Sequence, residues 1–146
     1  MRKERRMIMN TKTYTTLPQE AKDIRIEVFM KEQGFENEFD EIDTISHHIV
    51  VFDEGKPIGT CRFFKENDHY TIGRVAVLKA YRNQHIGNLL LISAEKEIIN
   101  LNGDLIVVHA QVRVSPFYTK QGYIQFGQID DNEGVPHMWM KKRIQH

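Results

Sequence analysis

The sequence predicts an α+β protein built on one mixed β-sheet. Segments with the spacing of strands and helices follow one another in the order β-α-β-β-β-α-β-α-β-β. Consecutive strands joined by short turns predict an antiparallel meander, and the strand–helix–strand unit over 70–110 predicts one parallel pair. The 146 residues have the length of one ordinary domain, so we expect residues 1–146 to form a single domain.

The first elements are a strand, a helix and an acidic stretch. Met7–Tyr14 fits a strand. A helix is predicted from a start at Thr16, with Pro in the first turn and Gln three residues after the cap, to about Glu32, and Gly34 ends it. The acidic residues of 35–46 fit a loop and a short helix equally well.

Three strands then form the expected meander. Ile49–Phe52 is the first strand, Asp53–Lys56 is a hairpin turn, and Pro57–Lys65 returns. Tyr70–Leu78 follows as the third strand.

A long helix is predicted over Ile86–Leu101. Its apolar residues recur three and four positions apart, which is the stripe of a helix that lies on a sheet. They are Leu90, Leu91, Ala94, Ile98 and Leu101.

The chain continues with a strand, a short helix and two strands. Leu105–Ala110 fits a strand, and Val114–Gln121 fits a short helix that Gly122 ends. Tyr123–Ile129 and His137–Lys142 are the last two strands.

Composition restricts the function classes. The 20 basic side chains equal the 20 acidic ones, so no overall field favours nucleic acid. No run approaches the roughly 18 apolar residues of a membrane helix, and the start of the chain lacks the apolar core of a secretory signal. We therefore expect a cytoplasmic protein with no membrane partner. The single cysteine, Cys61, excludes an internal disulfide and is expected to be buried.

The stretch "AYRNQHIGNLLL" (residues 80–91) passes abruptly from a polar, basic run into a helix. The first N–H groups of a helix lack partners within it and carry partial positive charge, so they can bind phosphate oxygens. Gly87 lets a ligand approach the backbone closely, and Arg82 adds a permanent cation. On spacing alone, an anion site and an ordinary loop are about equally supported.

The stretches "RVAVLKAYRNQHIGNLLL" and "SPFYTKQGY" make the chain resemble the GNAT superfamily of acyl-CoA-dependent N-acyltransferases. The first is similar to motif A, which reads Arg/Gln-x-x-Gly-x-Gly/Ala after a strand and falls here on Arg82, His85 and Gly87. "SPFYTKQGY" is similar to the family's Phe-Tyr-x-x-x-Gly-Phe/Tyr segment. "RIEVFMKEQ", "HAQ" and "GVPHMWM" resemble the small-protein branch called ElaA-like or YjcF-like, and the likeness covers nearly the whole chain.

The resemblance implies a mixed, mostly antiparallel sheet of about six to seven strands, flanked by helices and splayed at its centre to admit CoA. Acetyl-CoA would lie between the strand that ends near Val77 and the one that begins near Leu105. Backbone of the motif A strand would pair with pantetheine, and the loop after it would hold the pyrophosphate. The implied cofactor-binding residues are Val75, Ala76, Val77, Arg82, Asn83, Gln84, His85, Ile86, Gly87 and Asn88.

One residue departs from the family pattern. His85 replaces the first glycine of motif A, so its Cβ narrows the backbone space or the residue adopts a less favourable conformation. The following N–H groups can still bind phosphate, and the imidazole could contact the pyrophosphate.

Acyl transfer to an amine needs a neutral amine, a polarised carbonyl, alignment and protonation of the leaving thiolate. A backbone N–H near Val75–Val77 can polarise the carbonyl. Tyr118 matches the family's tyrosine and is the candidate acid; the alternative is that Phe117-Tyr118 only packs the short helix on the sheet.

The general base is not fixed by the resemblance. Some family members carry a Glu on the motif A strand, whereas Thr71-Ile72-Gly73-Arg74 has no carboxylate. By match to the branch, the candidates for the acceptor side are Glu32, Gln33, His109, Gln111 and His137. Only Glu32 and the two histidines can take a proton, and water is the alternative base.

Two other features have simpler readings. Adjacent His47 and His48 on a strand point to opposite faces and make a poor chelate, so no metal is expected. The acidic run Glu36–Asp43 is expected to be a solvated loop, with attraction of a cationic amine as the alternative.

The predicted function is transfer of an acetyl group from acetyl-CoA to a primary amine of a small molecule or peptide by direct attack. The alternative is a non-catalytic module that binds acyl-CoA and regulates a partner. The resemblance leaves a homodimer open, because dimers are common in the family.

Overall fold

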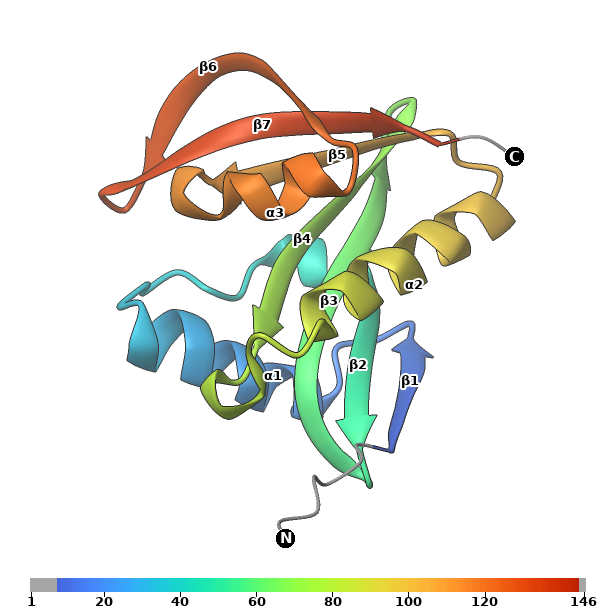
Figure 1. Cartoon of the computed structure of the whole chain (residues 1–146), viewed down its shortest axis with the longest axis vertical. Helices are drawn as coiled ribbons and strands as arrows, with labels where there is room; N and C mark the ends of the chain where they lie inside the picture. The colour runs from blue at the N-terminus through green and yellow to red at the C-terminus, as the bar shows by residue number, and fades with distance from the viewer. Residues whose placement is uncertain (1–7, 145–146) are drawn as a thin grey trace, which may run out of the picture.

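The computed structural model describes residues 8–144 and has one seven-stranded sheet in the order β1-β2-β3-β4-β5-β7-β6 (Figure 1). All neighbouring strands are antiparallel except β4 and β5, which are parallel, so the predicted mixed sheet is confirmed. Met7, placed in the first strand by the sequence, lies outside the described residues. The strands are β1 Met9–Tyr14, β2 His47–Asp53, β3 Lys56–Glu66, β4 His69–Val77, β5 Leu105–Gln111, β6 Ile124–Asn132 and β7 Val135–Arg143.

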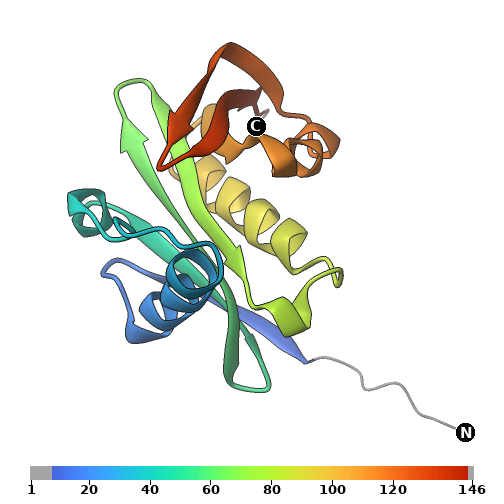
Figure 2. The same cartoon turned by 90° about the vertical axis from the view of Figure 1, so that its left-hand side faces the viewer.

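The two long helical segments cover opposite faces of the sheet (Figure 2). One is α1, Gln19–Arg25, which continues as the π-helix η1, Ile26–Glu32; the other is α2, Ile86–Asn100. Each face has its own cluster of buried apolar side chains. The shorter helices are η2 Glu41–Thr44, η3 Lys79–Tyr81, η4 Val112–Val114 and α3 Ser115–Lys120.

Helix α2 follows its predicted stripe except at its end. Leu90, Leu91, Ala94 and Ile98 are fully buried against the sheet, whereas Leu101 is 44% exposed. The prediction was wrong for Leu101 because the helix ends at Asn100, so the next side chain leaves the helical face.

The start of the first helix also differs from the prediction. Pro18, in an extended conformation, precedes the first helical residue, and no side chain caps this end. Thr16 is therefore not the cap. The second half of the segment is a π-helix, a form that occurs frequently at functional sites.

The sheet opens between β4 and β5. These strands pair at only three positions, the last being Ile72 with Val108. Beyond that point β4 carries one extra residue relative to β3, because Thr60 pairs with Ala76 but Arg62 pairs with Gly73. Arg74 in this bulge has a φ of 53°. A bulge bends its strand and increases its twist, which accounts for the separation of β4 from β5.

The acidic run Glu36–Asp43 is only partly the solvated loop that the sequence predicted, since most of its residues are exposed but two of its carboxylates are buried and its end forms the short helix η2. Glu38 and Asp43 are only 4% and 6% exposed. Asp43 accepts hydrogen bonds from Arg25 at 2.7 Å and Arg62 at 2.9 Å, and Glu38 pairs with Arg25 at 2.7 Å and Arg74 at 3.1 Å. The arginines come from α1, β3 and β4, so this burial depends on distant parts of the chain.

No helix within residues 8–144 is long and apolar enough to cross a membrane. Over the same range, no three His, Cys, Asp or Glu side chains gather in a way that could hold a metal ion.

Candidate active site

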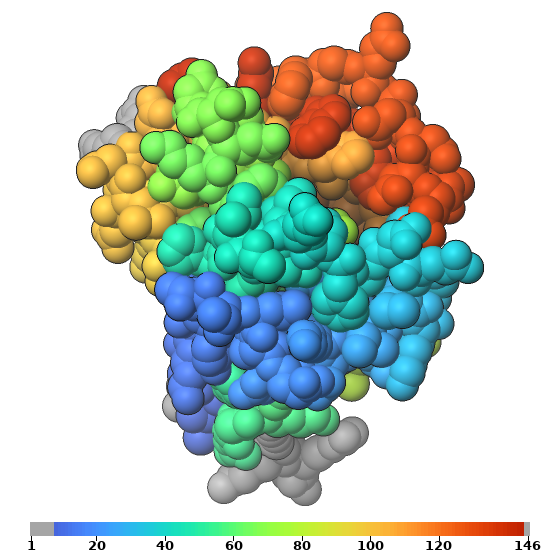
Figure 3. Space-filling view, turned by 180° about the vertical axis from the view of Figure 1, so that it is seen from behind, coloured from blue at the N-terminus to red at the C-terminus, as the bar shows by residue number. Residues whose placement is uncertain are grey.

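Two pockets lie along the opening between β4 and β5. The central pocket lies at the bulge and includes Val75 and Tyr118, and the loop pocket lies beyond the end of β4 and includes Val77 and Phe117. Val75 and Val77, like Phe117 and Tyr118, are close neighbours in the chain, so the two pockets lie close to each other. Figure 3 shows the face on which the central pocket opens, hollowed between the cyan segment after α1 and the orange β6–β7 hairpin.

The loop pocket contains the start of α2. Within residues 8–144, the N–H groups of Ile86, Gly87 and Asn88 donate to no other group, and the first helical bond at this end is from Leu89 to His85. Unpaired N–H groups at a helix start form an anion site. The residues around this space are suited to the pyrophosphate that the sequence predicted for it.

His85 adopts the strained alternative considered for it. Its φ is 62°, in the left-handed region that glycine would occupy at little cost, and Asn83 has a φ of 63°. The His85 ring lies 3.3 Å from the Asn88 amide. His85 therefore takes the left-handed conformation that a glycine would adopt at little cost. At Gly87 an added Cβ would lie 3.4 Å from the Phe117 ring, so this position has little spare room.

Arg82 is not a free cation at the loop. Its Nη2 lies 2.6 Å from Glu32, its second Nη also bonds that carboxylate, and its Nε donates to the Val77 carbonyl at 3.0 Å. The arginine therefore ties the loop both to the strand end and to the π-helix. The Arg82 hydrogen bond lowers the pKa of Glu32, which makes this carboxylate a poor proton acceptor.

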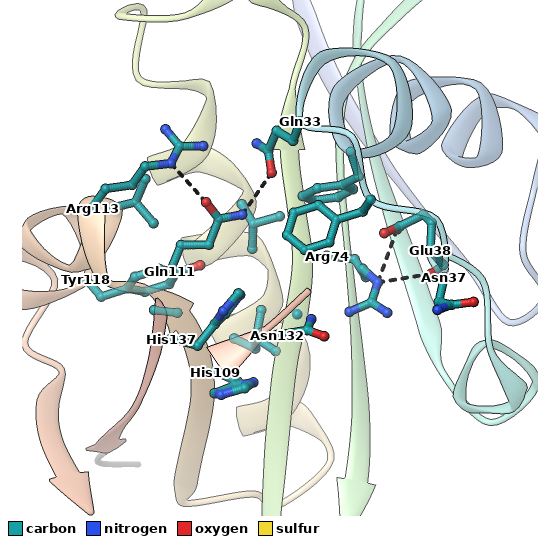
Figure 4. A pocket seen from close by; sticks show the side chains of 17 residues that line it. Gln33, Asn37, Glu38, Arg74, His109, Gln111, Arg113, Tyr118, Asn132 and His137 are labelled. Carbon is teal, nitrogen blue, oxygen red and sulfur yellow. Dashed lines mark hydrogen bonds and ion pairs between the residues drawn. The ribbon is translucent and has the colours of Figure 1, made fainter. Parts of the chain in front are cut away.

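Tyr118 is buried on the wall of the central pocket (Figure 4). Its ring packs edge-on against Phe117 and Tyr123, and within the described part of the chain its hydroxyl bonds no other group. Burial, with a smaller effect of Cys61, raises the pKa of Tyr118 above that of a free phenol, so the hydroxyl keeps its proton. Cys61 is itself fully buried, as expected, and burial raises the pKa of its thiol to about 12.

His137 and His109 lie together on the lower wall of the same pocket (Figure 4). His137 is 7% exposed, and its Nδ1 lies 2.8 Å from the Val135 carbonyl. A carbonyl can only accept, so Nδ1 carries the proton and Nε2 has a free lone pair. The centroid of the His109 ring lies 4.8 Å from that of the His137 ring. The His109 ring also stacks on Trp139, with 4.3 Å between the centroids.

Gln33 and Gln111 meet above the histidines. Gln111 donates to the Gln33 carbonyl oxygen at 2.8 Å and accepts from Arg113 Nε at 2.9 Å (Figure 4). The end of the π-helix is thus joined to the end of β5 across the opening. Of the predicted acceptor-side residues, Gln33, Gln111, His109 and His137 line the central pocket, whereas Glu32 lies outside it with Arg82.

Several residues of the central pocket were not predicted from the sequence. Arg74 comes from the bulge, Arg113 from η4 and Asn132 from β6, and Glu38 comes from the acidic segment. Arg113 lies two residues after Gln111, a predicted site residue, and this closeness in the sequence was the one signal that could have indicated it. The others reach the pocket through strand pairing and buried ion pairs that no local pattern displays.

The comparisons with known proteins agree with this architecture. The family model of the acetyltransferase (GNAT) domain matches residues 14–144, and the chain belongs to this family of acyltransferase enzymes. The uncharacterized N-acetyltransferase YjcF of Bacillus subtilis is 34% identical over 122 residues, which cover 82% of this chain and 87% of YjcF.

Two solved structures share the fold at low identity. Escherichia coli ElaA superposes with a TM-score of 0.81 at 22% identity, covering 94% of this chain and 99% of ElaA. An aminoglycoside 6'-N-acetyltransferase complexed with coenzyme A has a TM-score of 0.72 at 16% identity, covering 88% of this chain and 91% of that enzyme. These structures confirm the predicted GNAT fold, and the family model with YjcF supports the predicted enzyme class.

Proposed function

We propose that the chain transfers an acetyl group from acetyl-CoA to a primary amine, of a small molecule or a peptide, by direct attack in the central pocket. The observation that carries this proposal is the closeness of two pockets, the loop pocket at the start of α2 and the central pocket with Tyr118 and His137, which meet at the neighbouring residues Phe117 and Tyr118. A helix start with unpaired N–H groups at one end suits a pyrophosphate, and a protonated phenol opposite a basic imidazole at the other end suits acyl transfer.

Acetyl-CoA fits the groups that the opening presents. The loop of residues 82–88 supplies backbone donors for the phosphates, and Gly87 leaves the backbone accessible. Past Ile72 the strand β4 has no pairing with β5, so Val75 and Val77 lie where their backbone can meet the pantetheine amides. In the proposal, a backbone N–H of this stretch polarises the thioester carbonyl.

Tyr118 acts as the acid that protonates the leaving thiolate. Its raised pKa would make it a weak donor toward an ordinary thiolate. The same apolar surroundings hold the pKa of the neighbouring Cys61 thiol at about 12, so a thiolate formed beside Tyr118 is correspondingly more basic. The burial that weakens the acid thus also strengthens the acceptor of its proton.

His137 acts as the base that takes the proton of the amine. Its Nε2 lone pair is fixed by the Nδ1 bond to Val135, and it shares the central pocket with Tyr118. Glu32 has no proton role in this proposal, because Arg82 holds its carboxylate outside the pocket.

The test is release of free thiol from acetyl-CoA with a panel of amines, including alkylamines, amino acids and a peptide with a free N-terminus. We expect thiol release that depends on one amine class and acetylated product by mass spectrometry. Thermal stabilisation by acetyl-CoA with no amine-dependent turnover would contradict acetyl transfer to an amine. The cytoplasmic location, the homodimer and the lack of nucleic-acid partners stay predictions.

A further inference from the structure

Asp130 contacts His109 of the central pocket, and the proposed function gives this contact no role. Its Oδ1 lies 2.7 Å from His109 Nε2. The two residues come from β6 and β5, and β7 with His137 lies between them in the sheet. The side chains therefore meet over the strand that carries the candidate base.

The sheet register explains how Asp130 comes to this place. Asp130 pairs with His137, but Phe126 pairs with Trp139, so β6 has two more residues than β7 over this interval. Gly127, inside the irregularity, has a φ of 71° that suits glycine. The bulge thus sets Asp130 beside His137 on the same side as Phe126, where it can reach across to His109.

Hydrogen-bond chemistry fixes the tautomers of both histidines. A carboxylate only accepts, so His109 donates through Nε2 and keeps a lone pair on Nδ1. His137 donates through Nδ1 to Val135 and keeps a lone pair on Nε2. Each ring, at 4.8 Å from the other, therefore offers one nitrogen that can take a proton.

We propose that Asp130, His109 and His137 form a proton relay that carries the amine proton from the central pocket to solvent. The relay rests on the proposed function. As the amine nitrogen bonds to the carbonyl carbon, its N–H bond breaks and the proton moves to His137 Nε2. It passes from there to His109 Nδ1, directly or through one water, and then to solvent. As the C–S bond breaks, the Tyr118 hydroxyl proton moves to the sulfur, and the tyrosinate regains a proton from solvent, so the amide and the CoA thiol form with no net change in protons.

The exposure of the three groups increases along this route. The side chain of His137 is buried, that of His109 is 29% exposed and that of Asp130 is 48% exposed. The carboxylate is ionised, because its hydrogen bond from His109 lowers the pKa of Asp130. It stabilises an imidazolium beside it, as the carboxylate of a catalytic triad does, without taking up a proton itself.

The other charged groups around the histidines are not placed to stabilise an imidazolium as Asp130 does. Arg74 and Glu38 line the pocket but pair with each other at 3.1 Å, and Tyr118 keeps its proton. Arg113 lines the upper wall and donates to Gln111. Asp130 is therefore the carboxylate in contact with the histidine pair.

The test compares Asp130→Asn with Asp131→Asn, a neighbour on β6 that loses the same charge outside the relay. Asp131 accepts from the Gly134 N–H in the hairpin, which asparagine can also do. For Asp130→Asn we expect kcat to fall roughly ten- to a hundredfold, less than the loss of a base itself. Without the carboxylate the imidazolium forms less readily, so the acidic limb of the pH profile moves to lower pH.

A second variant and a second readout guard against a folding defect. His109→Phe keeps a ring on Trp139 but cannot carry a proton, and it should slow turnover by a similar factor with acetyl-CoA affinity unchanged. Nitrogen-15 NMR of the free protein should show His109 as the Nε2–H tautomer in wild type and a mixture in Asp130→Asn.

Three results would overturn the relay. They are an Nδ1–H tautomer of His109 in wild type, an unchanged pH profile in Asp130→Asn, and a loss of kcat/KM in Asp130→Asn that comes only from a higher KM. A wild type that releases no thiol with any amine would instead overturn the transfer itself, so the two failures are distinct.

Discussion

The loop pocket and the central pocket are built in different ways. The loop pocket comes mainly from one continuous segment, the end of β4 and the start of α2, with Phe117 and its helix beside it. The central pocket is assembled from η1, the acidic segment, β4, β5, η4, α3 and the β6–β7 hairpin. Binding of a common co-substrate can thus rest on local backbone geometry, whereas the chemistry and the choice of acceptor depend on distant elements.

This difference separates the expected effects of mutation. Changes in the loop should alter affinity for acetyl-CoA, and changes in the central pocket should alter turnover. A loop variant that lowers kcat, or a central-pocket variant that weakens acetyl-CoA binding, would contradict this separation.

The largest effect is expected for Tyr118→Phe. The ring keeps its contacts with Phe117 and Tyr123, but the proton for the thiolate is lost. We expect kcat to fall about 10²–10⁴-fold, or roughly 3–5 kcal/mol, with acetyl-CoA affinity and melting temperature nearly unchanged. An unchanged kcat, measured with affinity and melting on one preparation, would show that Tyr118 only packs the helix.

The next largest effect is expected for Asp43→Asn, which acts on the frame of the central pocket. Losing one member of a buried ion-pair cluster should lower the free energy of unfolding by about 3–5 kcal/mol. Its hydrogen bonds from Arg25 and Arg62 lower the pKa of Asp43 to about 2 despite burial.

The same pKa predicts how stability depends on pH. An unfolded Asp has a pKa near 3.9, so the contribution of Asp43 is present at pH 7 and is lost as the pH falls from about 5 toward 2. Glu38 acts in the opposite sense, because burial outweighs its arginine partners and raises its pKa. Denaturant unfolding between pH 7 and 3 should show wild type losing more stability than Asp43→Asn. Equal losses would contradict this role.

A smaller effect, confined to the loop, is expected for Gly87→Trp. The indole would occupy the space beside Phe117 and cover the N–H groups of the helix start. Acetyl-CoA affinity should fall about a hundredfold, or roughly 3 kcal/mol, by calorimetry. Ile92→Trp is the control, because Ile92 is 44% exposed on the same helix. Tight binding by Gly87→Trp would remove the loop from the site.

The smallest effect is expected for Arg82→Ala. Since Glu32 already neutralises this guanidinium, its loss should weaken acetyl-CoA by about 1–2 kcal/mol, mainly through loss of the bonds to Glu32 and the Val77 carbonyl. Affinity measured at two salt concentrations distinguishes the causes. A loss that shrinks strongly with salt would mean direct contact with phosphate.

Glu32→Gln should leave kcat unchanged, because the carboxylate is not the base.

Much of the fold followed from the sequence because its signals are local. The stripe of α2, the hairpin turn after β2 and the Gly-containing loop each need only neighbouring residues, and all appear at the expected places. Leu101 and Thr16 were misplaced because the exact end of a helix depends on packing that periodicity does not show. That residues 1–146 form a single domain stays a prediction.

The central pocket was only partly predictable. His137, His109, Gln33 and Gln111 could be named from the family resemblance, and they do meet in one pocket. The burial of Glu38 and Asp43 could not be predicted, because their arginine partners come from three separate elements. Asp130 likewise depends on a bulge in β6 that changes the register by two residues.

A crystal structure of the complex with acetyl-CoA is the most direct test of where the co-substrate binds. We expect the pyrophosphate on the N–H groups of residues 86–88, pantetheine between β4 and β5, and the sulfur beside the Tyr118 hydroxyl. A sulfur far from Tyr118, or acetyl-CoA bound in the groove between α1 and η3 instead, would contradict this expectation.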